Sequence, residues 1–112
     1  MSDGDYLVFD GDQLTDSELP GYEAGGVNAS LIFVDNLPGE GPRLHKHPYH
    51  EIFILLEGRS TFSVGSVTLE AEAGKIVVVR PGVAHKFVNS GPGRLRQIDI
   101  HASPKFITEW LE

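Results

Sequence analysis

Glycine and proline divide the apolar part of this chain into short runs, and this feature limits the fold more than any other. The 112 residues include 13 glycines and 7 prolines, with runs rich in Val, Ile, Phe and Leu between them. Short apolar runs separated by turn residues are typical of an all-β sandwich or barrel, because glycine and proline end regular structure. Helical periodicity is nearly absent. We therefore predict an all-β fold.

The expected strands follow these runs. They cover residues 6–9, 29–34, 44–47, 51–56, 61–64, 67–70, 76–79, 86–88 and 95–100. Gly65-Ser66 suits a tight hairpin because glycine adopts a positive φ without strain, and Pro81-Gly82 ends the run at 76–79. No repeat or linker interrupts the series, so we expect one domain.

Two of the runs are apolar on both faces. Residues 76–79 read IVVV and residues 52–56 read IFILL. Phe53 and Leu55 share a face with Glu51, because alternate residues of a strand point the same way. A strand without polar alternation must be covered on both sides. We therefore expect these runs inside a two-sheet stack or beneath a subunit contact, and we predict a homodimer.

Only residues 103–112 have a helical pattern. Ser103 offers an N-cap and Pro104 the first helical position, and the apolar residues that follow fall on one side of a helix. Those residues are Phe106, Ile107, Trp110 and Leu111. We expect a short C-terminal helix that packs its apolar stripe on the barrel or on a second subunit.

Charge is distributed unevenly along the chain, whose formal net charge is -7. Residues 1–42 contain nine of the 16 acidic residues and none of the nine lysines and arginines. A surface that binds phosphate groups needs clustered basic residues, so this pattern argues against a nucleic-acid partner. The acidic start has no basic region, and no apolar run is long enough to span a membrane. We therefore expect no membrane partner and a cytoplasmic protein.

The sequence HKHPYHE, residues 45–51, places three of the five histidines beside a carboxylate. Residues two apart in a strand face the same way, so His45 and His47 can direct their imidazoles to one point. The chain then turns, and a neighbouring antiparallel segment could bring the carboxylate of Glu51 to that point. Taken alone, the His-x-His pair is compatible with a metal site or with a polar loop whose histidines face water.

The wider spacing resembles the first signature of the cupin superfamily. In that signature a glycine is followed after five residues by His-x-His, after three more by glutamate, and after six more by a second glycine. The matching positions are Gly39, His45, His47, Glu51 and Gly58.

A second cupin signature follows at the expected distance. Its matching positions are Gly74, Gly82, His85 and Asn89. Arg80 stands where the family usually has proline. Since Pro81-Gly82 still provide the turn, this departure concerns the shape of the loop more than the binding of a metal.

The resemblance covers residues 29–102 and implies a double-stranded β-helix, the jelly-roll barrel of cupins. We expect residues 1–28 to add an N-terminal strand and an acidic arm to the same domain, and residues 103–112 to form the helical tail. The resemblance also implies four metal ligands inside the barrel. These are His45, His47, Glu51 and His85.

Three imidazoles and one carboxylate suit one divalent transition metal ion: Fe, Mn, Ni, Co, Cu or Zn. Cysteine is absent from the chain, so no thiolate competes as a ligand. Four ligands on an octahedral ion leave two positions for water or substrate. A divalent ion beside one carboxylate keeps a local positive charge, which favours an anionic or oxygen-rich small molecule.

Strand parity indicates further pocket residues. Phe53 and Phe87 share parity with Glu51 and His85, so they line the cavity around the metal or pack in the core. Tyr49 lies beside the His-x-His pair and is a further pocket candidate, whereas we expect His50 at the rim or on the surface.

The segment RQIDIH, residues 96–101, must point one of two faces inward. Ile98 and Ile100 form the natural interior choice. If the polar face points inward instead, Gln97 or His101 could support a metal ligand or act as an acid or base.

Two functions are compatible with this site. The first is a metal-dependent enzyme of dioxygenase, isomerase or lyase type that acts on a small oxygen-rich or anionic molecule. The sequence identifies no base for such a reaction. The second is a metal-dependent binding or sensor module without turnover, which the shortness of the chain favours.

Overall fold

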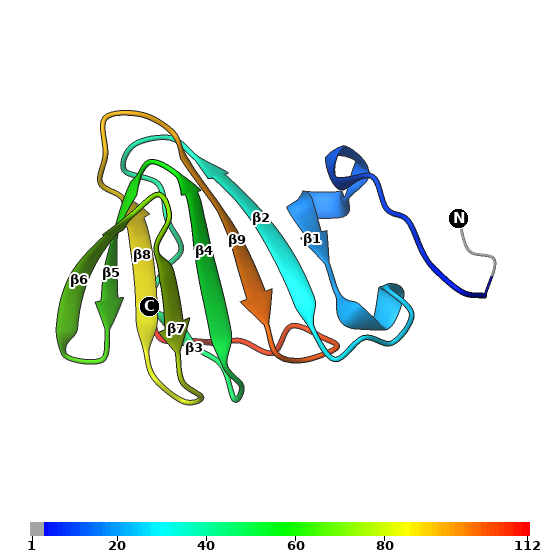
Figure 1. Cartoon of the computed structure of the whole chain (residues 1–112). Coiled ribbons are helices and arrows are strands. Elements are labelled where there is room, and N and C mark those ends of the chain that lie inside the picture. Colours follow the sequence, from blue (N-terminus) through cyan, green and yellow to red (C-terminus); the bar gives the residue numbers. More distant parts are fainter. Residues whose placement is uncertain (1–3) are drawn as a thin grey trace.

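Two antiparallel sheets of five strands each form the body of the protein (Figure 1). The computed structural model describes residues 4–112. One sheet has the order β1-β2-β9-β4-β7 and the other β10-β3-β8-β5-β6. The strands are β1 (Glu18–Leu19), β2 (Ser30–Asn36), β3 (His45–Lys46), β4 (Glu51–Glu57), β5 (Arg59–Val64), β6 (Val67–Glu72), β7 (Ile76–Val79), β8 (His85–Asn89), β9 (Leu95–His101) and β10 (Glu109–Trp110). The predicted all-β, two-sheet fold is confirmed.

Every strand predicted from residue 29 onward is formed, with ends that differ by no more than two residues. The hairpin predicted at Gly65-Ser66 is also present, because Val64 of β5 pairs with Val67 of β6. Gly65 has a φ of 57°. This value lies in the left-handed region that a tight two-residue turn requires, which glycine enters without steric cost.

The strand predicted at residues 6–9 is not formed. Only Leu7 makes an isolated bridge, and this apolar segment is exposed. β-propensity is realised only against a neighbouring strand, and the edge of β2 pairs with β1 instead. The rest of the arm contains the short 3-10 helices η1 (Gly11–Gln13), η2 (Thr15–Ser17) and η3 (Gly21–Glu23). Residues 1–3 of the predicted arm lie outside the described residues.

The predicted C-terminal helix is wrong. Residues 102–105 form bends and residues 106–108 have no regular structure. The strand β10 then pairs with the edge of β3, where Trp110 lies opposite His45. The amide of Leu111 also donates a 2.9 Å hydrogen bond to the carbonyl of Leu44. A helix this short is marginal on its own, whereas the edge of β3 offers unpaired backbone groups that the tail satisfies.

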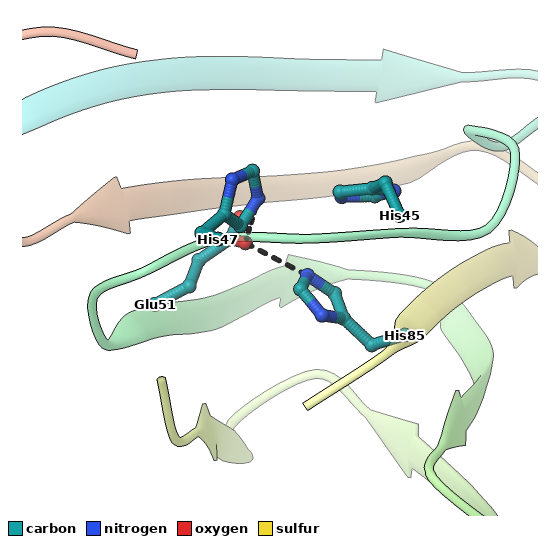
Figure 2. A group of neighbouring side chains, drawn as sticks. All are labelled: His45, His47, Glu51 and His85. Atoms are coloured by element: carbon teal, nitrogen blue, oxygen red, sulfur yellow. Dashed lines mark hydrogen bonds and ion pairs between the residues drawn. The ribbon is translucent and has the colours of Figure 1, made fainter. Parts of the chain in front are cut away.

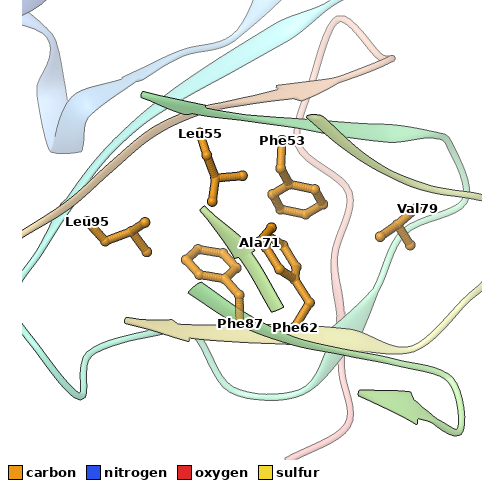
Figure 3. Close-up of a cluster of buried hydrophobic side chains, with 7 residues drawn as sticks. All are labelled: Phe53, Leu55, Phe62, Ala71, Val79, Phe87 and Leu95. Atoms are coloured by element: carbon orange, nitrogen blue, oxygen red, sulfur yellow. The ribbon is translucent and has the colours of Figure 1, made fainter. Parts of the chain in front are cut away.

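The hydrophobic core fills the barrel beyond the start of β4 (Figure 3). Its buried members are Phe53, Leu55, Phe62, Ala71, Val79, Phe87 and Leu95. The rings of Phe53 and Phe62 meet edge to face with centroids 5.1 Å apart. Each such side chain stabilises the fold by about 1.5–3 kcal/mol through burial. Along β4 the inward positions run from Glu51 to Phe53 and Leu55, so a polar site lies at one end of the core.

Among the described residues, no helix has the length and apolar character needed to cross a membrane.

Candidate metal centre

The four predicted ligands converge inside the barrel (Figure 2). One donor atom from each of His45, His47, Glu51 and His85 lies within 4.8 Å of every other, and all four residues are buried. His45 of β3 pairs with His85 of β8 in one sheet, whereas Glu51 begins β4 in the other. The carboxylate therefore reaches the histidines across the barrel interior, and the expectation that it would come from a strand beside β3 is wrong.

The turn before β8 fixes the position of two of these side chains. The amide of Gly82 donates a 2.8 Å hydrogen bond to the carbonyl of His47, which ties the His-x-His segment to the loop that leads into His85. Gly82 has a φ of 79°, a conformation that other residues rarely adopt. Arg80 is exposed and Pro81-Gly82 form the expected turn, so the departure from the cupin signature leaves the ligand geometry intact.

Each ligand histidine uses its Nδ1 on a backbone carbonyl. The partners are the carbonyl oxygens of Arg43 at 2.6 Å from His45, Ile107 at 2.8 Å from His47 and Val83 at 2.9 Å from His85. A carbonyl only accepts hydrogen bonds, so these contacts place the proton of each neutral ring on Nδ1. Every Nε2 is then left with a lone pair, which is the state in which imidazole binds a metal.

These lone pairs meet a carboxylate in a dry environment. Nε2 of His85 lies 3.0 Å and Nε2 of His47 lies 3.1 Å from Oε1 of Glu51. Among the described residues, the buried Nε2 of His47 has no hydrogen-bond partner. Lone pairs that face a carboxylate oxygen need a positive charge between them, either a proton or a metal ion. The donor set therefore fits a metal ion.

The pKa directions agree with a cation at this point. Burial on its own would raise the pKa of Glu51, but the contacts with His101, His47 and His85 outweigh it and hold that pKa far below its usual range. Burial lowers the pKa of His85, yet the Glu51 carboxylate and the Val83 carbonyl raise it above its usual value. A bound divalent ion would take the place of the proton that these contacts favour.

A second layer of contacts orients the ligand carboxylate. Nε2 of His101 lies 3.0 Å from Oε2 of Glu51, on the side away from His47 and His85. The hydroxyl of Tyr49 accepts a 3.1 Å hydrogen bond from the amide of Ile107 and donates to Nδ1 of His101 at 2.7 Å. The pocket candidates Tyr49 and His101 are thus connected to the four candidate ligands through Glu51.

The polar face of residues 96–101 points inward, so the interior position expected for Ile98 and Ile100 is wrong. Gln97, Asp99 and His101 are at most 3% exposed. Nε2 of Gln97 donates a 2.8 Å hydrogen bond to Oδ1 of Asp99, and His101 contacts Glu51 and Tyr49. These contacts offset part of the cost of burying polar groups, although Oε1 of Gln97 has no hydrogen-bond partner among the described residues. The two isoleucines instead extend an apolar surface on the outside of the sheet.

Comparison with known proteins agrees with this architecture. A family model described as "Cupin domain" matches residues 32–101, more than half of the chain. The chain belongs to the cupin family. No curated protein matches it.

Solved structures share the fold of this cupin. A conserved protein with a double-stranded beta-helix domain from Klebsiella pneumoniae is 22% identical with a TM-score of 0.70, and the match covers 76% of each chain. Oxalate decarboxylases from Lactobacillus farciminis and Bacillus subtilis are 22% and 21% identical, each with a TM-score of 0.76 over 84% of this cupin. The cupin spans only 30% and 27% of those two chains.

An open cavity of about 790 Å³ adjoins the ligand set of this cupin. Of the predicted pocket residues, Phe87 and His101 line it. Phe53 packs in the core, Gln97 bonds to Asp99, and Tyr49 acts through His101. His50 is exposed, as expected.

Two acidic residues of the cavity wall were given no role from the sequence: Asp99, which belongs to the polar face of residues 96–101, and Glu18. The parity of Asp99 with His101 could have identified the first. Glu18 lies in the arm, where nothing in the local sequence indicates contact with the barrel interior. Burial raises the pKa of Asp99 well above its usual value, and the negative charge of Glu51 adds to the effect.

Proposed function

We propose that this cupin binds one divalent transition metal ion through His45, His47, Glu51 and His85 and is a metal-dependent enzyme acting on a small oxygen-bearing molecule. The observation that carries the proposal is the convergence of donor atoms from three buried histidines and one buried carboxylate, with Nδ1 of each histidine on a backbone carbonyl. A buried set of this kind is costly without a cation, because each donor has lost its hydration.

A bound ion would supply Lewis-acid or redox chemistry to a substrate at the open coordination positions. The residues of the chain prepare the site for it. The backbone carbonyls fix the imidazole rings, and the Tyr49–His101 pair holds Oε2 of Glu51. The aromatic core that begins at Phe53 closes the barrel below the ligands and excludes water there.

The donor set suits Fe, Mn, Ni, Co, Cu or Zn, since it contains nitrogen and oxygen ligands and no thiolate. The Bacillus subtilis oxalate decarboxylase has Mn(II) centers, and one of its structures matches the fold of this cupin with a TM-score of 0.76. This likeness supports Mn(II) as one of the candidates.

The test is metal analysis of protein purified without an affinity-metal column. We expect about one equivalent of a transition metal per chain in the wild type and a large loss of occupancy in His47→Ala and His85→Ala. His50→Ala is the matched control, because this exposed histidine neighbours Glu51 in sequence and lies outside the ligand set. Equal metal content in His47→Ala and in the control would contradict the proposal.

A metal-dependent binding or sensor module without turnover is the second candidate function. The hydrogen bond between Tyr49 and His101 favours this function. Polar groups that bond to each other beside the ligands are not available as an acid or base for a substrate. Oxygen consumption by the Fe(II)-loaded protein, together with product analysis across small acids, alcohols and sugars, separates the two functions. Turnover of any compound supports the enzyme, and saturable binding without turnover supports the module.

The proposal includes a homodimer and a cytoplasmic location, both predicted from the sequence. The outer face of the first sheet supports the dimer. Ile76 and Val78 of β7 are 63% and 55% exposed there, beside the partly buried Ile52 and Ile54 of β4. A contiguous apolar sheet face of this kind is typical of a surface that a second chain covers.

A further inference from the structure

The cavity beside the ligand set is acidic. Six of the residues that line it are acidic: Asp16, Glu18, Asp35, Glu40, Glu51 and Asp99. None of the described residues that line it is a lysine or an arginine. Recognition of an anionic substrate needs such side chains or a strong positive field. The charge of this wall therefore bears directly on which substrate the site accepts.

Glu18 reaches this cavity from the N-terminal arm. It pairs with Ile32 of β2, which in turn pairs with Asp99 of β9. Residues directly opposite each other in a sheet point to the same side, so Glu18 shares the inward face of Asp99. The two preceding residues, Asp16 and Ser17, have φ values of 54° and 59°. This left-handed backbone is costly for residues other than glycine and often marks functional segments.

Asp16 is exposed, and Glu18 is half-buried with only the charge of His101 acting to lower its pKa. Neither forms an ion pair with a cationic side chain among residues 4–112, whereas Asp35 of the same wall pairs with Arg94 at 2.7 Å. Glu18 is half-buried, and its pKa is raised by burial and by the neighbouring charge of Asp16. A partly buried carboxylate without a cation is unfavourable, so a cationic ligand group would find a prepared partner here.

The charges can be added for the loaded site. A divalent ion contributes two positive charges, and Glu51, Glu18, Asp16 and Glu40 contribute up to four negative ones, since Asp35 is paired with Arg94. The expectation of an anionic ligand included only the charge of Glu51. When the acidic residues of the arm are included, the net charge of the ion-loaded cavity changes from positive to negative. The carboxyl group of Asp99 is neutral or negative, so it cannot make the net charge of the cavity more positive. A dianion therefore gains no net attraction from the cavity as a whole.

We propose, on the basis of the metal site proposed above, that this cupin selects a small molecule that bears a protonated amine together with a neutral oxygen donor. The oxygen faces the ion, and the ammonium group faces Glu18 and Asp16 of the arm. Phe106, whose ring meets that of His101 edge to face with centroids 5.0 Å apart, also lines the cavity and provides apolar surface for the carbon chain between the two groups. Simple carboxylates are disfavoured.

The experiment compares three linear four-carbon compounds on Co(II)-loaded protein: aminobutanol, butanediol and hydroxybutanoate. They share one terminal hydroxyl and differ only in the charge of the other end. Affinity is measured by calorimetry at fixed ionic strength, and the Co(II) absorption spectrum of each sample reports ion content. We expect the amine to bind about tenfold more tightly than the acid, with the diol between them. Equal affinities, or tighter binding of the acid, would overturn the proposal.

Variants locate the effect. Glu18→Gln should reduce the preference for the amine over the diol by at least about threefold while Co(II) content stays unchanged, since one carboxylate of the wall is lost. Glu72→Gln makes the same chemical change at an exposed position outside the cavity and should leave the preference intact. An unchanged preference in Glu18→Gln refutes the role of the arm. Failure of the wild type to bind Co(II) would instead refute the metal site, so the two outcomes are distinguishable.

Discussion

Tyr49→Phe removes one oxygen atom from the contacts that orient Glu51. The lost hydroxyl donates at 2.7 Å to Nδ1 of His101, which is 3% exposed, and accepts at 3.1 Å from the amide of Ile107. Water can replace the second contact because that hydrogen bond is exposed. The buried Nδ1 is left without a donor, which costs about 1–2 kcal/mol.

The expected shift in melting temperature follows from the size of the chain. An unfolding entropy of about 2.1 cal/mol/K per residue gives about 0.24 kcal/mol/K for a chain of this length, so Tm should fall by about 4–8 °C. His101 would no longer be held against Oε2 of Glu51, and loss of such an outer contact typically lowers metal affinity about 10–100-fold.

The assay pairs thermal unfolding of the metal-free protein with a competitive metal titration against a chromophoric chelator. Tyr22→Phe is the matched control, because this tyrosine is 65% exposed and lies outside the cavity wall. A fall in Tm with unchanged metal affinity would refute the positioning role of Tyr49, since a purely structural contact predicts that result. Unchanged values for both would refute the hydrogen-bonded chain itself.

Two further predictions concern Asp99 and the outer sheet face. Because burial raises the pKa of Asp99, the folded state favours the protonated acid, and wild-type stability should decline relative to Asp99→Asn as pH rises above the unfolded pKa of about 3.9. Urea midpoints at several pH values measure this difference, which should be about 1.4 kcal/mol for each unit of raised pKa, and parallel curves would contradict it. Light scattering at micromolar concentration should give twice the chain mass of 12.2 kDa, and Val78→Lys should give the monomer; a monomeric wild type would exclude the dimer.

Part of the ligand set was predictable from local sequence, and Glu51 and His85 were added to it by the resemblance to the cupin signatures. Spacing and strand parity alone place His45 and His47 on one face, and both cupin signatures survive in the sequence. The strands β2 to β9 were equally predictable, since short apolar runs bounded by glycine and proline leave few alternatives. Neither inference requires knowledge of how the sheets pack.

The tail and the arm were not predictable, because their conformations depend on distant partners. Trp110 belongs to a strand only because β3 has a free edge beside it. Residues 6–9 have β-propensity but form no more than the isolated bridge at Leu7, and Glu18 faces the cavity only through its pairing with β2. Propensity and periodicity describe a segment, whereas these outcomes depend on which edges and faces the rest of the chain leaves open.

The orientation of β9 connects the site with the predicted dimer. A monomer gains most by burying Ile98 and Ile100, yet this strand turns them outward and buries Gln97, Asp99 and His101. With the opposite orientation of β9, His101 would no longer contact Glu51, and Asp99 would no longer line the cavity. Isoleucine side chains would lie beside the ligands instead. The inward polar face thus serves the metal centre and leaves an apolar face outside. Association of a second chain on that face would recover the burial that the site forgoes. On this reasoning, disruption of the dimer should lower stability more than it alters metal binding.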